Sequence, residues 1–338
     1  MDKPIALILH PKEWATSKYG KNSRFDFHHV SIGGKIPKKR NGVPTFDGYA
    51  DCATLEGMQA ARTLFTQLRP AIFFFWMHGD FPPSFLIQLK RISPKTKFVH
   101  WFGNHRHSVV GNVTRYQRTL DMLFLNSKDP RQIKMYKKIV PHVKTLYDGF
   151  APSEVKLVEN KPEFDCFFGG NSYMGAIIGN KKLDFPGGKI RFDLICEAHK
   201  QFKLHVTSGY SKFWPFKVQP EVFHPHYTTE MRRAKITLNV NHFPTLYKAY
   251  TRRTIRSIFA RRCHITLYIP GMEEDFENHK HLVWFKTVDE GIDLIKYYLD
   301  HDTEREEIAW AGWKLAMKKY TFHNRMEDFD RFTKVLVP

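Results

Sequence analysis

Arginines, the side chains best suited to binding phosphate, cluster in the stretch RRTIRSIFARRCHITLYIPGMEEDF, residues 252–276. Arg252 and Arg253 stand at the start of a predicted helix, and Arg256 follows one turn later. The N-terminus of a helix carries unpaired N–H groups and partial positive charge, so arginines in its first turn suit a diphosphate. The alternative is a solvated basic face above an apolar stripe.

A second candidate ligand contact is the turn in FFGGNS. Gly169 and Gly170 follow a predicted strand, where the absence of side chains lets a ligand approach the backbone, and Asn171 and Ser172 add short polar groups. A plain turn explains these residues equally well. Tyr210, in VTSGYSKF after another strand, is a candidate to stack on a nucleobase, with packing against neighbouring aromatic residues as the alternative.

Alternating strands and helices must position these residues. In the first half, short apolar runs predict parallel strands covered on both faces, at 5–9, 71–76, 98–101, 122–125 and 143–146. Helical patterns separate them, at 53–68, 84–92 and 129–139. In the last of these, Asp129 is a natural N-cap and Pro130 occupies the first helical position.

The segment DGFAPSEVKLVENKP, residues 148–162, interrupts this pattern and is interpreted as a linker. After it the alternation restarts, with strands at 164–168, 204–207, 236–240 and 264–268 and helices at 191–202, 228–234 and 288–299, together with the arginine helix, which opens near Thr251. The predicted fold class is therefore α/β, with two Rossmann-like doubly wound domains facing each other across a cleft. We expect domains at 1–155 and 156–338, the last helix being able to pack back on the first domain.

The composition excludes several classes of protein. With 338 residues, 42% of them hydrophobic and 15% aromatic, the chain can fill two cores, which argues against disorder. Its four cysteines are far apart and without CxxC spacing, as expected of reduced thiols in a cytosolic protein. The N-terminal apolar run is too short for a signal peptide and no run is long enough to span a bilayer, so we expect a cytoplasmic location.

The C-terminal run from RRAKITLNVNHF to AGWKLAMKKYTFHNR resembles the C-terminal domain of GT-B glycosyltransferases, specifically the CgeB-like group. The shared features are a strand ending in Asn, an arginine-bearing helix, the turn PGMEEDF and the closing segment. The resemblance covers residues 229–329, and more weakly FFFWMHGDFPPSFLIQLKR, KFVHWFGN and DCFFGGNS. It implies a GT-B fold and a nucleotide-sugar co-substrate, expected to be a UDP-sugar, whose diphosphate is held by the helix that carries Arg253.

The sequence departs from that family at the donor site. The family usually has a glutamate three residues after the helix arginine, where it holds sugar hydroxyls, and this chain has Arg256. The common ACG that follows is replaced by Ala260, Arg261 and Arg262. Either the donor is held differently, or the alignment is shifted by a turn, or activity is lost, so the departure puts the donor's identity in question more than the fold.

Catalysis in such an enzyme needs a base for the acceptor hydroxyl or, in retaining enzymes, a donor-side arrangement with little help from side chains. Asp80 follows the strand in FFFWMHG and is the first candidate base, with His78 and His105 next and His107 and His10 as further candidates. The HxH pair at 105 and 107 has no third ligand at a suitable spacing, so we expect no metal site. No tightly bound cofactor is implied.

The net charge of +19 is more than a donor diphosphate requires, and it indicates an anionic partner. Double-stranded DNA is the leading candidate, because its backbone rewards distributed Lys and Arg. Residues expected to contact DNA are Lys38, Lys39, Arg40 and Arg106. GT-B enzymes of bacterial viruses that glycosylate hydroxymethylated bases in DNA offer a precedent, which would place this protein in the host cytoplasm.

Three functions therefore compete. The first is a glycosyltransferase acting on a hydroxymethylated base in DNA, and the second is one acting on a cell-surface or spore-coat glycan or protein. The third is an inactive GT-B relative that binds nucleic acid.

Overall fold

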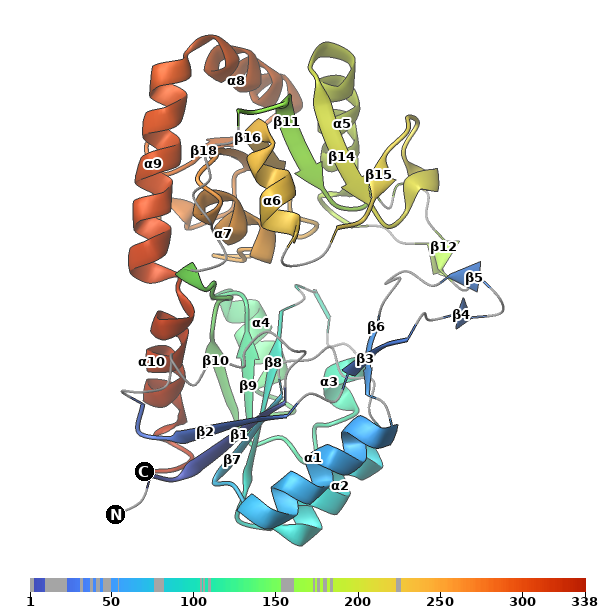
Figure 1. Cartoon of the computed structure of the whole chain (residues 1–338), viewed down its shortest axis with the longest axis vertical. Helices are drawn as coiled ribbons and strands as arrows, with labels where there is room; N and C mark the ends of the chain where they lie inside the picture. The colour runs from blue at the N-terminus through green and yellow to red at the C-terminus, as the bar shows by residue number, and fades with distance from the viewer. Residues whose placement is uncertain are drawn as a thin grey trace. The chain divides into compact units, whose positions relative to one another are not determined.

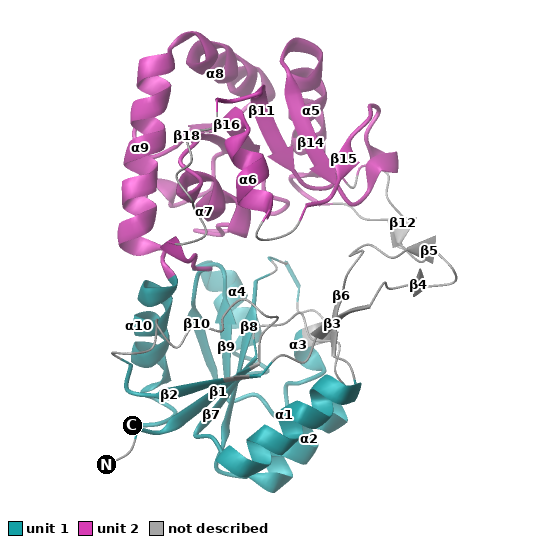
Figure 2. Ribbon diagram, viewed as in Figure 1, with its two compact units in different colours: residues 1–147, 322–338 teal, residues 148–321 magenta. Residues whose placement is uncertain are grey.

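Short apolar strands build two parallel sheets (Figure 1). The computed structural model describes residues 3–9, 23–30, 33–36, 39–40, 43–44, 50–53, 55–75, 82–103, 105, 107–108, 111–152, 161–172, 174, 177–178, 181–182, 185–222 and 226–338. The chain divides into two compact units: unit 1 combines Met1–Tyr147 with Phe322–Pro338, and unit 2 is Asp148–Thr321 (Figure 2).

Unit 1 contains a six-stranded sheet in the order β10-β9-β8-β7-β1-β2, with every neighbouring pair parallel. Its strands are β1 (Ile5–Leu9), β2 (Asp26–Val30), β7 (Ile72–Phe75), β8 (Lys97–Phe102), β9 (Met122–Leu125) and β10 (His142–Thr145). Its helices are α1 (Leu55–Leu68), α2 (Pro83–Ile92), α3 (Gly111–Thr114), α4 (Pro130–Tyr136) and α10 (Phe322–Thr333). Two small antiparallel pairs complete it, β3 (Gly33–Ile36) with β6 (Ala50–Ala53) and β4 (Lys39–Arg40) with β5 (Val43–Pro44).

The phenylalanines of β7 show why this sheet is buried on both faces. Successive side chains of a strand point to opposite faces. Phe73 packs against Phe65 of α1 with ring centroids 5.5 Å apart, whereas Phe74 packs against Phe329 of α10 at 5.0 Å. Helices therefore cover both faces, as the continuous apolar run predicted.

Helix α10, at the end of the chain, belongs to unit 1 because polar bonds and aromatic packing join it to the start of β2. The Asp330 carboxylate accepts hydrogen bonds from the Ser23 hydroxyl at 2.7 Å and from the Arg24 backbone N–H at 3.1 Å. Phe329 also packs against Phe25, with ring centroids 5.9 Å apart.

Unit 2 contains a second parallel six-stranded sheet, in the order β15-β14-β11-β16-β17-β18. Its strands are β11 (Phe164–Gly169), β14 (Leu204–Ser208), β15 (Gln219–Pro220), β16 (Ala234–Asn239), β17 (Cys263–Leu267) and β18 (Val283–Phe285). Its α-helices are α5 (Gly188–Gln201), α6 (His226–Arg232), α7 (Arg252–Phe259), α8 (Val288–Asp300) and α9 (Asp302–Lys319). The short pair β12 (Ile177–Ile178) and β13 (Lys181–Lys182) is antiparallel.

Both faces of this sheet are also covered. Phe168 of β11 belongs to a large core with Leu194 and Ile195 of α5, while the preceding Phe167 packs with Met231 of α6. The α/β fold with two doubly wound units, predicted from the alternation of strands and helices, is confirmed.

The segment interpreted as a linker is partly core. Asp148 and Phe150 are 2% and 1% exposed, and both lie against α7 within unit 2. The interpretation of 148–162 as linker throughout is therefore wrong at its start, because Phe150 buries its ring there. Among the described residues no helix is long and apolar enough to cross a membrane.

Candidate functional site

The order of strands in unit 2 marks the place where a ligand is expected. Strand β11 is followed by β14 and β15 on one side, and the chain then crosses to the other side to form β16, β17 and β18. The topological switch point therefore lies between the adjacent carboxyl ends of β11, at Gly169, and β16, at Asn239. In open α/β sheets, ligands bind at this position.

Arg253 lies at this switch point and contacts both strand ends. Its Nε donates a hydrogen bond to Asn239 Oδ1 at 3.2 Å. Its guanidinium also lies against Gly170, so closely that a Cβ on Gly170 would be 3.3 Å from Arg253 Nη1. The structure thus brings together two of the features singled out in the sequence, the Gly-Gly turn and the arginine helix.

A buried network fixes the orientation of Asn239, which is 0% exposed. Its amide nitrogen donates to Asn241 Oδ1 at 3.1 Å and to the Thr254 hydroxyl at 3.2 Å. The amide oxygen therefore faces Arg253, and Asn239 holds the base of the guanidinium in place.

The amino terminus of α7 opens at the same place. Its N-cap is Thr251, whose side chain makes no capping hydrogen bond. A helix that lacks a side-chain cap still presents N–H groups and partial positive charge at its first turn. Together with Arg253, this end of the helix has the chemistry of a phosphate site.

The other two arginines of the helix have different surroundings. Arg252 forms an ion pair through Nε with the carboxylate of Asp148, which is 2% exposed, so its charge is balanced within the protein. Arg256 is 6% exposed, and its guanidinium lies over the rings of Phe150, at 4.9 Å, and Tyr227, at 5.7 Å. Arg256 is thus part of the wall that supports Tyr227.

Tyr227, from α6, closes the site on the β11 side. Its hydroxyl donates to the Gly169 carbonyl oxygen at 3.1 Å, and a Cβ on Gly169 would lie 2.3 Å from that hydroxyl oxygen. Gly169 is therefore required by the close approach of Tyr227. Burial raises the pKa of Tyr227, although the nearby cations Arg253 and Arg256 oppose the rise, so the phenol is neutral at pH 7.

Comparison with known proteins identifies the family model and the solved structures that this chain resembles. Residues 188–331, from α5 to α10, match a family model described as glycosyl transferase-like. A sequence search of curated proteins gave no match.

Solved structures share the whole architecture at low identity. A glycosyltransferase from Rickettsia africae ESF-5 matches with a TM-score of 0.60 at 11% identity, covering 100% of both chains. HepE (Alr3699) from Anabaena, solved with UDP and glucose, matches at 0.56 and 8% identity, covering 98% of this chain and 100% of that one. The sucrose-phosphate synthase of Thermosynechococcus elongatus matches at 0.56 and 9%, covering 99% of each chain.

The chain has the GT-B fold. Residues 188–331 match the glycosyl transferase-like family model. The sequence resemblance to GT-B glycosyltransferases is confirmed at this level.

Three other residues expected at the donor site of the GT-B fold are occupied in holding loops together. The Asn171 side-chain oxygen accepts from the Ser208 hydroxyl at 2.8 Å and from the backbone N–H groups of Gly209 and Tyr210 at 3.0 and 3.2 Å. Ser172 donates to the Phe213 carbonyl at 2.8 Å. Asn171 and Ser172 therefore fix the loops after β11 and β14, and the Tyr210 ring lies 5.7 Å from that of Phe213.

Arg191 was not among the residues predicted from the sequence, and its side chain is fully buried. Its guanidinium donates to the Val240 carbonyl at 2.9 Å and to the Asn171 carbonyl at 2.9 Å, which ties the end of β16 to the loop after β11. One sequence signal pointed to it: Arg191 shares the apolar stripe of α5 with Leu194 and Ile195.

The candidate residues of unit 1 are only partly described. Among them His105 is 7% exposed, and its Nε2 lies 2.8 Å from the Asn126 carbonyl oxygen. The carbonyl requires a proton on Nε2, so in the neutral ring Nδ1 is the nitrogen that accepts a proton. His107 is exposed. The remaining candidates lie outside the described residues: His10, Lys38, His78, Asp80 and Arg106.

Lys39 and Arg40 form the short strand β4, of which only the backbone is described. Among the described residues no group of His, Cys, Asp or Glu is arranged to hold a metal ion.

Proposed function

We propose that this protein is a glycosyltransferase that uses a nucleotide-sugar, with UDP as the nucleotide. The observation that carries this proposal is Arg253, held between Gly170 and Asn239 at the switch point of unit 2. A diphosphate placed there receives a guanidinium and the positive end of α7 together. The glycosyl transferase-like match over 188–331 and the fold shared with HepE, which was solved with UDP and glucose, support the same donor.

In this proposal each residue has a distinct task. Arg253 binds the diphosphate, while Gly169 and Gly170 let it approach the strand ends. Asn171 and Ser172 hold the loop, and Tyr210 stacks on the base. Arg252 is paired with Asp148, and Arg256 supports the wall behind Tyr227.

The reaction is written as a displacement at the anomeric carbon of the donor. The acceptor oxygen forms a bond to that carbon, the bond to the phosphate oxygen breaks, and the nucleoside diphosphate leaves with the electron pair. A base removes the acceptor proton. We propose Asp80 as that base, with His78 and His105 as the next candidates, on the strength of their positions in the sequence.

For the acceptor we propose a hydroxymethylated base in duplex DNA, which rests on the net charge of +19. Lys38, Lys39, Arg40 and Arg106 are the proposed DNA contacts. A glycan or protein acceptor is the other outcome of the test. A cytoplasmic location fits the described cysteines Cys166, Cys196 and Cys263, which are free thiols.

The proposal is tested by incubating the protein with a panel of UDP-sugars and measuring release of UDP, with and without hydroxymethylated duplex DNA or glycan acceptors. Release of UDP from at least one donor is expected, and stimulation by the DNA supports the DNA acceptor. Stimulation by glycans alone would replace the DNA acceptor by a glycan. No release under any condition would overturn the enzyme and leave a nucleic-acid-binding relative.

A further inference from the structure

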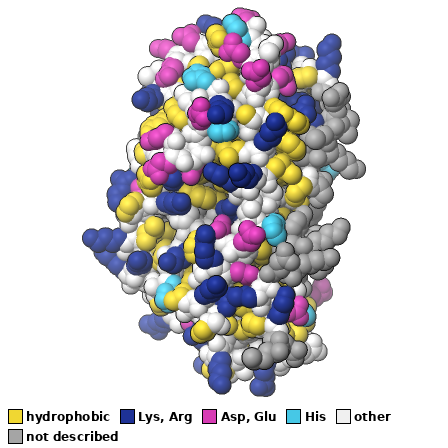
Figure 3. Space-filling model, turned by 90° about the vertical axis from the view of Figure 1, so that its left-hand side faces the viewer, with side chains coloured by type: hydrophobic (Ala, Val, Ile, Leu, Met, Phe, Trp, Pro, Cys, Tyr) yellow, Lys and Arg dark blue, Asp and Glu magenta, His cyan; other side chains and the backbone are white. Residues whose placement is uncertain are grey.

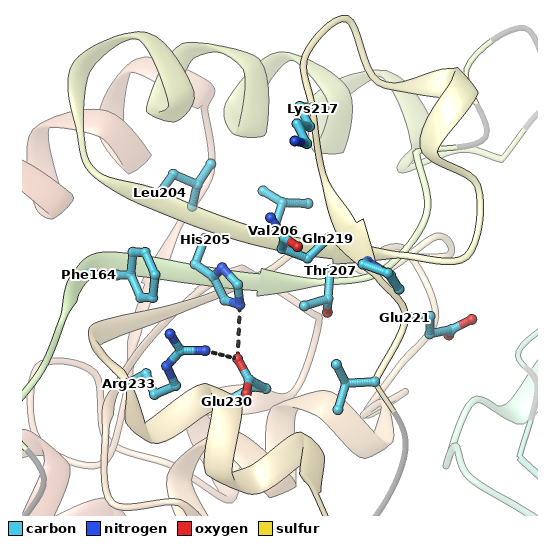
Figure 4. Close-up of a pocket in the computed structure, with 12 residues that line it drawn as sticks. Phe164, Leu204, His205, Val206, Thr207, Lys217, Gln219, Glu221, Glu230 and Arg233 are labelled. Carbon is cyan, nitrogen blue, oxygen red and sulfur yellow. Dashed lines mark hydrogen bonds and ion pairs between the residues drawn. The ribbon is translucent and has the colours of Figure 1, made fainter.

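Unit 2 contains a cavity of about 670 Å³ at the edge of its sheet, lined by residues of β11, β14, β15 and α6 (Figure 4). It forms because β15 pairs with β14 only at Thr207 and Ser208. Beside residues 204–206 the described part of the chain places no strand on this edge, and the cavity lies there. Its volume is in the range of small-molecule sites.

The cavity is separate from the donor site, although helix α6 contributes to both. Tyr227, at the start of α6, faces Gly169, whereas Glu230 and the following Arg233 line the cavity. None of Gly169, Gly170 and Arg253 lines it.

An ion network links the polar side chains along one wall of the cavity. Glu230 Oε2 accepts from His205 Nε2 at 3.0 Å and from Arg233 Nη1 at 2.8 Å (Figure 4). Arg233 also donates to Glu163 at 2.7 Å. Across the lining, the carboxylates Glu221 and Glu230 are matched by the cations Lys217 and Arg233. Since the charges balance, the cavity favours a neutral ligand over a strongly charged one.

The hydroxyl of Thr207 is a buried polar group that a ligand could satisfy. It is 1% exposed, yet among the described residues its hydroxyl has no hydrogen-bond partner. A buried hydroxyl without a partner is costly, and a ligand hydroxyl can both donate to it and accept from it. The exposed side-chain amide of Gln219, on the neighbouring strand, can also donate and accept hydrogen bonds.

The apolar lining disfavours a planar ligand. Two aromatic rings line the cavity, those of His205 and Phe164. The Phe164 ring stacks on His205, with ring centroids 4.6 Å apart, and the Arg233 guanidinium lies 5.1 Å from its centre. Its faces are therefore not open to a nucleobase. The remaining apolar surface is aliphatic, from Leu204, Val206, Pro220 and Val222, and suits the C–H faces of a sugar ring.

We infer that this cavity is a second carbohydrate site, which binds a neutral saccharide of two or more sugar units through Thr207, Gln219 and Glu230. At this site the enzyme would bind a glycan in addition to the donor sugar, which binds elsewhere. The inference does not depend on the donor assignment, because the two sites share no residue that binds a ligand.

The test is binding of the full-length protein to an array of neutral, sialylated and sulfated glycans. The wild type is expected to bind neutral glycans best, and Thr207→Val should weaken that binding about three- to tenfold, the scale of one lost hydrogen bond. Thr228→Val is the matched control: Thr228 is 2% exposed, its hydroxyl also has no partner among the described residues, and it does not line the cavity. It should bind like the wild type.

UDP affinity, measured on the same proteins, should be unchanged by Thr207→Val, which separates this inference from the proposed donor site. If Thr207→Val fails to fold, Gln219→Ala, at an exposed position, takes its place and should also weaken binding. Binding to no neutral glycan, a preference for acidic glycans, or equal binding by the substituted protein and the control would overturn the inference.

Discussion

At the scale of single residues, buried side chains that titrate set how the protein responds to acid. His264 of β17 is 0% exposed, and burial lowers its pKa to about 3, against a partial rise from its bond to the Thr237 backbone. In the unfolded chain a histidine has a pKa of about 6.5. Between these values the unfolded state binds more protons, so the free energy of unfolding falls as pH falls, by up to about 1.4 kcal/mol per pH unit.

Urea unfolding at pH 7, 5.5 and 4.5 checks this effect. The wild type should lose stability across this range, and His264→Gln should lose less, because its side chain does not titrate. His226→Gln, at an exposed position, should follow the wild type. Equal slopes for the wild type and His264→Gln would show that His264 does not contribute.

A second prediction for a single residue concerns Asp80, the proposed base. Asp80→Asn should lower turnover by about 10²- to 10⁴-fold, the usual contribution of general base catalysis, and leave UDP affinity unchanged. Steady-state rates and UDP titrations on the same protein separate the two effects. Asp293→Asn, an exposed position on α8, is the control. Full activity of Asp80→Asn would remove Asp80 from the mechanism.

The sequence predicted the role of a residue when that role depends on its own strand or helix, and not when it depends on a contact with a residue far away in the chain. The Gly-Gly turn and Arg253 follow strand and helix patterns, and the structure brings them together. Tyr227 gave no comparable signal, because its role comes from a contact with Gly169, far away in the sequence. Asp148 was interpreted as linker for the same reason: its partner, Arg252, lies on a distant helix.

At the scale of elements, the start of unit 2 packs onto α7. Phe150 is 1% exposed, its ring lies 5.5 Å from that of Phe259, and the Arg256 guanidinium lies over it. Phe150→Ala should therefore lower the free energy of unfolding of unit 2 by about 3–5 kcal/mol, as other large-to-small core changes do. Leu55→Ala, at a position that is 69% exposed, should cost about 0.5 kcal/mol or less.

Chemical denaturation followed by tryptophan fluorescence and circular dichroism measures both changes. A loss for Phe150→Ala no greater than that for Leu55→Ala would mean that the segment is a linker after all.

Among the elements, the apolar strands and the helices with clear caps were the predictable ones. Asp129 accepts from the backbone N–H groups of Arg131 and Gln132 at 2.9 and 3.3 Å, so the predicted N-cap of α4 is confirmed.

Strand β2, Asp26–Val30, was missed because its sequence DFHHV mixes charged, imidazole and apolar side chains at the edge of the sheet. Edge strands make weaker patterns, since only part of their surface is buried.

At the scale of the whole molecule, the net charge of +19 is larger than the binding of a donor diphosphate requires. On the face shown in Figure 3, Lys and Arg side chains are interspersed with hydrophobic and acidic ones. What decides DNA binding is the number of phosphates contacted, because affinity falls with salt at a logarithmic slope of about 0.9 per phosphate neutralised.

Binding of a fluorescent duplex across a salt series measures that number. For a DNA acceptor we expect a slope of about four or more. Replacing Lys38, Lys39 and Arg40 by Glu should lower the slope and leave hydrolysis of free nucleotide-sugar unchanged, because the proposed donor site is in the other unit. Binding that is weak at low salt, or insensitive to salt, would exclude DNA and favour a glycan acceptor.

The proposed donor site depends above all on Arg253, between Gly170 and Asn239, binding the diphosphate. Calorimetric titration of UDP into the wild type, Arg253→Ala and Arg261→Ala tests it most directly. Arg261→Ala removes the same charge from a guanidinium that lies over Trp310 at 5.0 Å. We expect Arg253→Ala to weaken UDP binding by about 1–3 kcal/mol, the scale of a charge-assisted contact, and Arg261→Ala to bind like the wild type. Unchanged affinity in Arg253→Ala, or equal losses in both variants, would show that Arg253 does not bind the diphosphate.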